Sequence, residues 1–287
     1  MDVLRYTAFS DSPDGGNPAG VVLDASGASD EEMLAIAAEV GFSETAFLMP
    51  AGSATEGDER DAATRMTVRY FSPLAEVAFC GHATIASGVA WADRHGPGTL
   101  LLDTASGEVA VRTQTKDGLT TATLVSVPTT TKALSDADLD TILQTLRWSR
   151  DDLDPAIPPR VAFAGAWHPI IAARTRERLA DLDYDFDGLG ELMADRGWTT
   201  TDLVWRESPT VFHARNPFPP GGVVEDPATG AAAAAFGGYV RELGLVGLPA
   251  TLTVHQGVDM GRPGLLTIDI PAEPGTGIAV TGTAVPI

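Results

Sequence analysis

Three titratable side chains stand in sequence settings that could support proton transfer. Glu44 lies inside the apolar, strand-like run FSETAF, His82 follows the pair Cys80-Gly81, and Asp226 precedes Pro227. A carboxylate in apolar surroundings is either a hydrogen-bonded structural acid or an acid whose raised proton affinity suits proton transfer near neutral pH. Read alone, His82 could be an ordinary helix-start residue and Asp226 a turn or capping residue.

Two glycine turns stand beside these groups. Gly81 and Gly230 each precede an apolar segment rich in small residues, which we expect to be helical. The first N–H groups of a helix have no partner within it and carry a partial positive charge, so each turn could hold a carboxylate. The alternative is that each turn only caps its helix, and the spacing favours neither.

Cys80 is the single cysteine of the chain. One cysteine excludes an internal disulfide and, by the same count, a Cys-based zinc site. An inert, buried thiol is the preferred interpretation of Cys80, and no metal ligand is predicted.

The elements that must position these residues are mostly short strands. Segments rich in Val, Ile and Thr, punctuated by Gly, Pro or Asp, are typical of half-buried antiparallel strands. They span residues 66–71, 108–115, 120–127, 210–214, 251–255, 265–270 and 278–285, while residues 51–63 are expected to form an exposed acidic loop.

Four helices are predicted. One begins with a capping box at Ser29 and ends at Gly41, and a second begins at Ser135 with apolar residues at helical spacing. The other two, at residues 83–92 and 231–240, are apolar nearly all round and must be buried on every side. A sheet wrapped around each central helix would achieve this.

The same order of elements occurs in both halves of the chain, which indicates an internal duplication. We therefore predict an α+β fold with two pseudo-symmetric domains, each with a curved antiparallel sheet around a central apolar helix. The domains are assigned to residues 1–127 and 128–274, and the last strand, within residues 275–287, is a candidate to return to the first domain. If the duplication is a pseudo-two-fold, both helix N-termini face one interdomain cleft.

The charge balance restricts the partners. Of 287 residues, 39 are Asp or Glu and 19 are Lys or Arg, which gives a formal net charge of −20. Such a surface repels phosphate backbones and anionic lipids, so neither nucleic acid nor a membrane is expected as a partner. No apolar run approaches the roughly 18 residues of a membrane span, and no signal-peptide pattern occurs, so a cytoplasmic location is predicted.

Five motifs in order resemble the PhzF family of phenazine-biosynthesis-like isomerases, over residues 5 to 270. Each motif alone is weak, but the five in this order are specific. They are GNPAGVV at 16–22, SET at 43–45, CGHAT at 80–84, EDPATG at 225–230 and QGVDMGRP at 256–263.

This resemblance implies the diaminopimelate-epimerase-like fold and a cofactor-free isomerase, usually a homodimer, acting on a small carboxylate substrate. It implies that Glu44 is the general acid/base, that His82 and Asp226 bind and orient the substrate, and that the amides of Gly81 and Gly230 face its carboxylate. Asn17 and Arg215 are weaker candidates for substrate binding, and either could be structural.

Two departures matter. The phenazine enzymes resemble EDPATGSA, whereas this chain has Ala231 in place of that serine, so the pocket lacks one hydroxyl. Two-base epimerases of this fold use one cysteine per half, whereas this chain has Cys80 in the first half and Thr229 near the second position, so a two-thiol mechanism is excluded. An epimerase that uses Cys80 with another base, and a non-enzymatic binding module, remain as alternatives.

Overall fold

The computed structural model describes residues 1–51 and 63–287, and nearly all of the predicted acidic loop lies outside them. The chain divides into two compact units. Unit 1 comprises Met1–Val125 and Thr281–Ile287, and unit 2 comprises Ser126–Val280.

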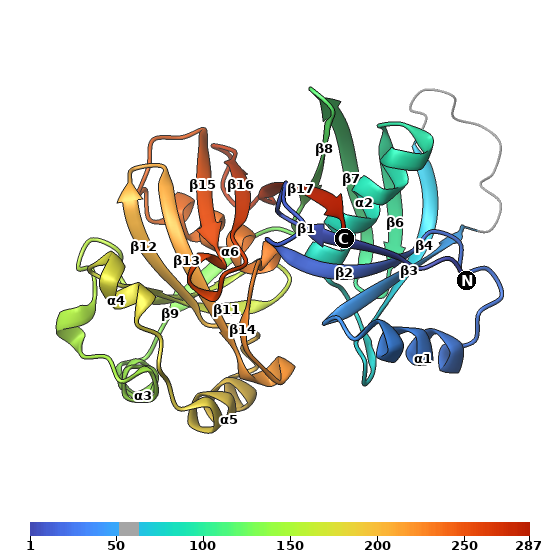
Figure 1. Cartoon of the computed structure of the whole chain (residues 1–287). Coiled ribbons are helices and arrows are strands. Elements are labelled where there is room, and N and C mark those ends of the chain that lie inside the picture. Colours follow the sequence, from blue (N-terminus) through green and yellow to red (C-terminus); the bar gives the residue numbers. More distant parts are fainter. Residues whose placement is uncertain (52–62) are drawn as a thin grey trace. The chain divides into compact units, whose positions relative to one another are not determined.

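Unit 1 is a ring of strands around one helix, α2 (Figure 1). Following the pairings gives the closed order β1–β2–β3–β4–β6–β7–β8–β17–β1 among the described residues. The last strand of the chain therefore completes the sheet that the first strand begins. The elements are β1 (Leu4–Ala8), β2 (Asn17–Val22), α1 (Asp30–Val40), β3 (Glu44–Pro50), β4 (Thr64–Phe71), β5 (Glu76–Val77), α2 (Gly81–His95), β6 (Thr99–Thr104), β7 (Gly107–Lys116), β8 (Leu119–Val125) and β17 (Ala279–Pro286).

The sequence of α2 explains its central place. Its residues from His82 to Ala90 are all buried, as expected for a helix without a polar face. Gly88 allows β7 to approach closely, because a Cβ at this position would lie 2.8 Å from Cγ1 of Val111. A side chain there would push the sheet away from the helix.

Unit 2 has the same plan around α6. Strands β9, β10, β11, β12, β13, β15 and β16 pair in that order, and β14 pairs with β13. Its elements are β9 (Thr130–Ala133), α3 (Asp136–Leu146), β10 (Arg160–Phe163), β11 (Trp167–Ala172), α4 (Arg176–Ala180), α5 (Phe186–Arg196), β12 (Asp202–Ser208), β13 (Val211–Phe218), β14 (Val223–Asp226), α6 (Gly230–Glu242), β15 (Ala250–Gln256) and β16 (Gly264–Ile270), with 3-10 turns at Arg150–Asp152, Pro219–Gly221 and Val258–Met260.

The duplication predicted from the sequence is confirmed by the pairings. The antiparallel pairs β1–β2, β3–β4 and β6–β7 of unit 1 correspond to β10–β11, β12–β13 and β15–β16 of unit 2. The sheets are mixed rather than purely antiparallel, because β2–β3, β4–β6, β11–β12 and β13–β15 are parallel. Parallel neighbours need a crossover, which α1, α2, α4 with α5, and α6 supply.

Helices on the outer face of each sheet form further cores. In unit 1, Met33 and Ala37 of α1 pack with Phe47 of β3. In unit 2, α3 and α5 cover the outer face of the sheet, where Leu203 of β12 lies in their shared core.

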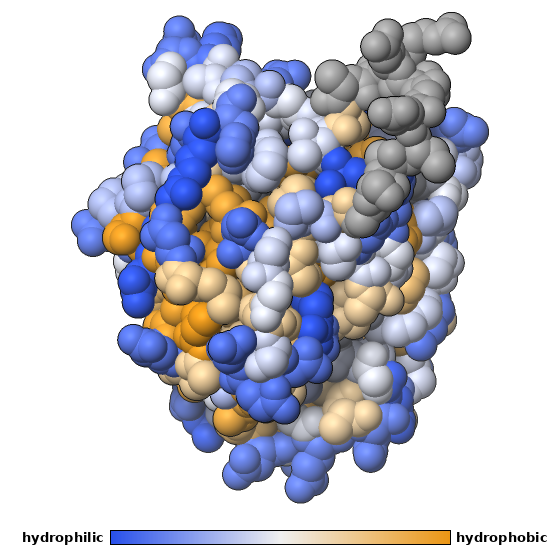
Figure 2. Space-filling model, turned by 90° about the vertical axis from the view of Figure 1, so that its right-hand side faces the viewer, coloured by the Kyte–Doolittle hydropathy of each residue, from blue (hydrophilic) through white to orange (hydrophobic). Residues whose placement is uncertain are grey.

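Among the described residues, no helix is both long and apolar enough to cross a membrane. Hydrophilic side chains cover much of the face in Figure 2, with apolar patches between them.

Candidate functional site

The first residue of β3 is Glu44, and its side chain shares the sheet face that looks toward α2. Register pairs it with Ala19 of β2, while the alternate residues Thr45 and Phe47 point to the outer face. Gly20 has no room for a side chain, because a Cβ there would lie 2.5 Å from Oγ1 of Thr45. The GNPAGVV and SET motifs are therefore two strands in close contact.

Asn17 opens β2 and is buried, with 2 % of its surface exposed. It precedes Ala19 by two residues, so it lies on the same sheet face as Glu44. The structure thus brings Asn17 and Glu44 to one face at one end of adjacent strands.

The start of α2 carries the histidine and the thiol. The Nε2 atom of His82 lies 3.4 Å from Oε2 of Glu44 and 3.4 Å from Oγ of Ser43. The Sγ atom of Cys80 lies 3.3 Å from Nδ1 of His82 and 3.8 Å from its Nε2. Acid, imidazole and thiol therefore form one cluster, in which the side chains of Glu44 and His82 are only 16 % and 7 % exposed.

The N-terminus of α2 is tied by hydrogen bonds to its neighbours and leaves its first amides unused by the helix. Cys80 occupies the cap position without a side-chain capping bond, and its carbonyl accepts the first helical hydrogen bond from the N–H of Thr84 at 3.0 Å. The Thr84 hydroxyl also donates to this carbonyl and contacts the hydroxyl of Tyr70, both at 2.6 Å. The N–H of Gly81 is thus one of the donors with no acceptor inside the helix.

In unit 2 the second turn is built by a side-chain amide. Gln256 donates from Nε2 to the carbonyl of Asp226 at 2.8 Å and accepts from the N–H of Thr229 at 3.0 Å. The Thr229 hydroxyl donates to Oδ2 of Asp226 at 2.5 Å. These bonds fix Asp226 directly before α6, which begins at Gly230 and continues with Ala231.

The loop after β15 supports that turn. Gly257 has a φ of +76°, and a Cβ there would lie 2.2 Å from the carbonyl oxygen of Arg262 and 2.7 Å from that of Pro227. Only glycine fits this close approach. The QGVDMGRP motif therefore packs against the EDPATG turn and supports its conformation.

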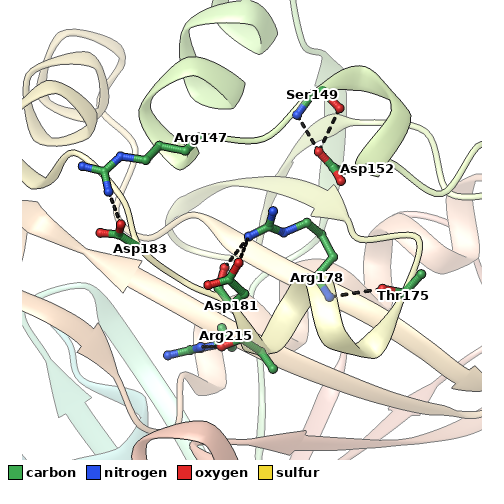
Figure 3. Close-up of polar contacts among 9 residues, drawn as sticks. Arg147, Ser149, Asp152, Thr175, Arg178, Asp181, Asp183 and Arg215 are labelled. Atoms are coloured by element: carbon green, nitrogen blue, oxygen red, sulfur yellow. Dashed lines mark hydrogen bonds and ion pairs between the residues drawn. The ribbon is translucent and has the colours of Figure 1, made fainter.

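Arg215 lies on the other face of β13 from that turn. Its guanidinium donates to both carboxylate oxygens of Glu225, at 2.9 and 2.6 Å, and to the carbonyl of Ala180. Figure 3 shows it beside the end of α4, where Arg178 pairs with Asp181. Because Glu225 and Asp226 are consecutive in a strand, they point to opposite faces, and the structure does not bring Arg215 to Asp226.

The sequence did not predict a series of buried, hydrogen-bonded polar side chains in unit 2. Asp202 is the first residue of β12 and pairs in register with Ile170, as Glu44 pairs with Ala19, so it is the counterpart of Glu44 in the duplication. Asn216 donates to Oδ1 of Asp202 at 3.1 Å and accepts from the hydroxyl of Thr200 at 2.7 Å. The Thr200 hydroxyl also lies 2.8 Å from Nδ1 of His168.

Burial shifts the pKa values of Asp202 and His168, the two titratable groups of this hydrogen-bonded series. It raises the pKa of Asp202 to about 7 and lowers the pKa of His168 to about 4. The sequence did hold a signal: His168-Pro169 occupies the position in β11 that Asn17-Pro18 occupies in β2.

The cluster of unit 1 also bears on metal binding. Glu44, Cys80 and His82 offer ligand atoms that all lie within 4.8 Å of one another. The exclusion of a Cys-based zinc site was therefore too broad: a count of cysteines excludes sites built from several thiolates but not a mixed set.

Residues 6–287 match the family model described as "Phenazine biosynthesis-like protein" (PhzC-PhzF). The chain belongs to this family. Its relatives include the "Uncharacterized isomerase YfhB" of Bacillus subtilis, 30 % identical over 99 % of this chain and 96 % of that protein. They also include the trans-2,3-dihydro-3-hydroxyanthranilate isomerase of Pseudomonas chlororaphis, 28 % identical over 90 % of this chain and 86 % of that protein.

The fold of this PhzF-family chain agrees with the comparison. The crystal structure of a Bacillus anthracis PhzF-family protein matches with a TM-score of 0.84 at 24 % identity, covering 100 % of this chain and 98 % of the other. The predicted family, fold class and isomerase class are confirmed.

Proposed function

We propose that this PhzF-family isomerase works without a cofactor and moves a proton, and with it a double bond, in a small unsaturated amino acid that carries a carboxylate. The observation that carries the proposal is the position of Glu44, 3.4 Å from His82 at the open N-terminus of α2. It supplies a shielded acid/base group beside a ready-made anion site.

Glu44 acts as the single acid/base group. As base it takes a proton from one substrate carbon, and the electrons of that C–H bond form the new double bond. The electrons of the old double bond then take the proton back from Glu44 at another carbon on the same face. His82 holds the amino or hydroxyl group of the substrate, and Asp226 is a candidate binding residue of unit 2. Amides at the start of α2, including that of Gly81, bind its carboxylate and the developing negative charge. In unit 2, Gly230 and Ala231 offer the equivalent amides at the start of α6.

The family and one residue of this chain support a proposal for the substrate class. The P. chlororaphis relative is named for trans-2,3-dihydro-3-hydroxyanthranilate, a cyclic, unsaturated amino acid. We propose a substrate of this class with one polar group fewer, because Ala231 replaces the serine hydroxyl that the phenazine enzymes have. Asn17 remains a candidate contact on the Glu44 face.

The test is deuterium incorporation from solvent, followed together with product formation, in a panel of dihydroaromatic and unsaturated amino acids. Glu44→Gln should lower turnover by the roughly 10²–10⁴-fold that general acid/base catalysis contributes, while binding persists. Glu39→Gln, the same change at an exposed acid of α1, is the matched control and should leave turnover intact. Turnover by Glu44→Gln at the level of Glu39→Gln would refute the assignment.

An epimerase that uses the thiol is the second candidate, favoured by the 3.3 Å contact between Cys80 Sγ and His82 Nδ1. Cys80→Ser separates the two, because a carboxylate mechanism keeps most of its turnover and a thiol mechanism loses it. The family resemblance also favours a homodimer, which light scattering of the purified protein would test.

A further inference from the structure

The cluster at the start of α2 has a second chemical capacity. Within residues 1–51 and 63–287, Glu44, Cys80 and His82 are the one set of three carboxylate, thiol or imidazole groups whose ligand atoms all lie within 4.8 Å of one another. Their three donors are an oxygen, a sulfur and a nitrogen. A thiol combined with an imidazole selects zinc and similar soft or borderline ions over magnesium and calcium.

The spacing suits tetrahedral zinc. Bonds of about 2.3 Å to sulfur and about 2.0–2.2 Å to nitrogen or oxygen place neighbouring ligand atoms roughly 3.3–3.6 Å apart. His82 Nε2 lies 3.4 Å from Glu44 Oε2 and 3.8 Å from Cys80 Sγ. Glu44 and Cys80 offer ligand atoms within 4.8 Å of each other, so side-chain rotation must bring these two closer for all three atoms to reach one ion.

We propose that Glu44, Cys80 and His82 bind Zn²⁺, with a fourth position left for water or an anion. A thiolate and a carboxylate neutralise the two charges of the ion, so the buried complex carries no net charge with a neutral imidazole. The N-terminus of α2 stabilises the thiolate at Cys80. The partial positive charge at that helix end repels the cation, but the negative charges of the carboxylate and the thiolate offset this repulsion.

The consequence for activity rests on the proposed function. Zinc bound to Glu44 occupies the carboxylate that would move the proton, so the ion is an inhibitor of the isomerase and not its cofactor.

Cobalt titration of the metal-free full chain tests the site without any substrate. Because Cys80 is the only cysteine in the sequence, a sulfur-to-cobalt charge-transfer band in the near ultraviolet can come from no other residue. We expect this band to saturate at one Co²⁺ per chain and to disappear when Zn²⁺ displaces the cobalt. A band that fails to appear, or that needs several equivalents of cobalt, would overturn the proposal.

Variants then assign the ligands. Cys80→Ser should abolish the band, and His82→Asn and Glu44→Gln should each weaken cobalt binding by more than the roughly 10–100-fold cost of losing an outer-shell partner. Unchanged affinity in either of the last two would show that thiol binding alone produced the band. Circular dichroism of each variant confirms folding, and Zn²⁺ protection of wild-type Cys80 from alkylation gives a second readout.

A matched control is available in unit 2. His213 lies 2.7 Å from Glu207 and stacks on His255, a histidine–acid group with no sulfur. His213→Asn should leave the charge-transfer band unchanged. If Glu44→Gln keeps full isomerase turnover while the band behaves as expected, the proposed function fails and the zinc site stands.

Discussion

Replacing Asp202 by Asn should remove a large pH dependence from the stability of the chain. In the folded protein burial raises the pKa of Asp202 to about 7 from an ordinary value of 3.8. The folded state therefore holds a proton that the unfolded state has released between these two values. Stability from this group is fully present below pH 3.8 and is lost as pH rises through 7.

The magnitude follows from the two pKa values. Linkage gives a loss of about 2–3 kcal/mol in the free energy of unfolding between about pH 5 and about pH 8 for Asp202 alone. His168 acts in the opposite direction, because burial lowers its pKa to about 4 and its contribution is lost as pH falls through that value. The wild-type curve combines both groups, so the difference between Asp202→Asn and wild type isolates the carboxyl.

Urea unfolding followed by tryptophan fluorescence, at several pH values across that range, measures the effect. Relative to wild type, Asp202→Asn should gain about 2–3 kcal/mol between the acid and alkaline ends. Its amide oxygen can still accept the hydrogen bond that Asn216 donates to Oδ1. Asp195→Asn, at an exposed position of α5, should run parallel to wild type. If the Asp202→Asn curve also ran parallel, the buried carboxyl would not have the shifted equilibrium assigned to it.

Two further predictions concern stability. Arg215→Met should lower the free energy of unfolding in urea by about 3–5 kcal/mol, because it leaves the buried carboxylate of Glu225 without its ion-pair partner. The double variant with Glu225→Gln should recover much of this loss, and equal losses in the single and double variants would contradict this account. Gly88→Ala should cost about 1–3 kcal/mol despite the better helix propensity of alanine, because its Cβ would meet Val111 at 2.8 Å. In thermal unfolding, a double-mutant cycle with Val111→Ala should show coupling between the two sites, and additive losses would contradict the clash.

Local signals in the sequence were enough for some elements. Ser29 and Glu32 form the predicted capping box, and Gly41 ends α1 in a left-handed conformation. Helix α5 was missed because two glycines interrupt its pattern. At one of them, Gly188, a Cβ would lie 2.5 Å from the side chain of Asp185, which caps the helix by accepting the N–H of Gly188. That requirement is visible only in three dimensions.

Long-range contacts separate what was predicted from what was not. The motif order pointed to Glu44 and His82, and the structure places them 3.4 Å apart although 38 residues separate them. No local pattern could show that Cys80 belongs with both, or that Asp202 is tied to Asn216. Such pairs depend on strand register, which the sequence determines only through the whole sheet.

The closure of unit 1 by β17 has a consequence for how the protein is made. Tyr6 pairs in register with Pro286, so the strand ring of unit 1 cannot close until β17 has emerged from the ribosome. At about 5–20 residues per second, synthesis of unit 2 takes roughly 8–30 s after β8 is complete. During that time β1 and β8 each present an unpaired edge, the kind of surface on which nascent chains associate. The ring of unit 1 can close only once unit 2 has been synthesised.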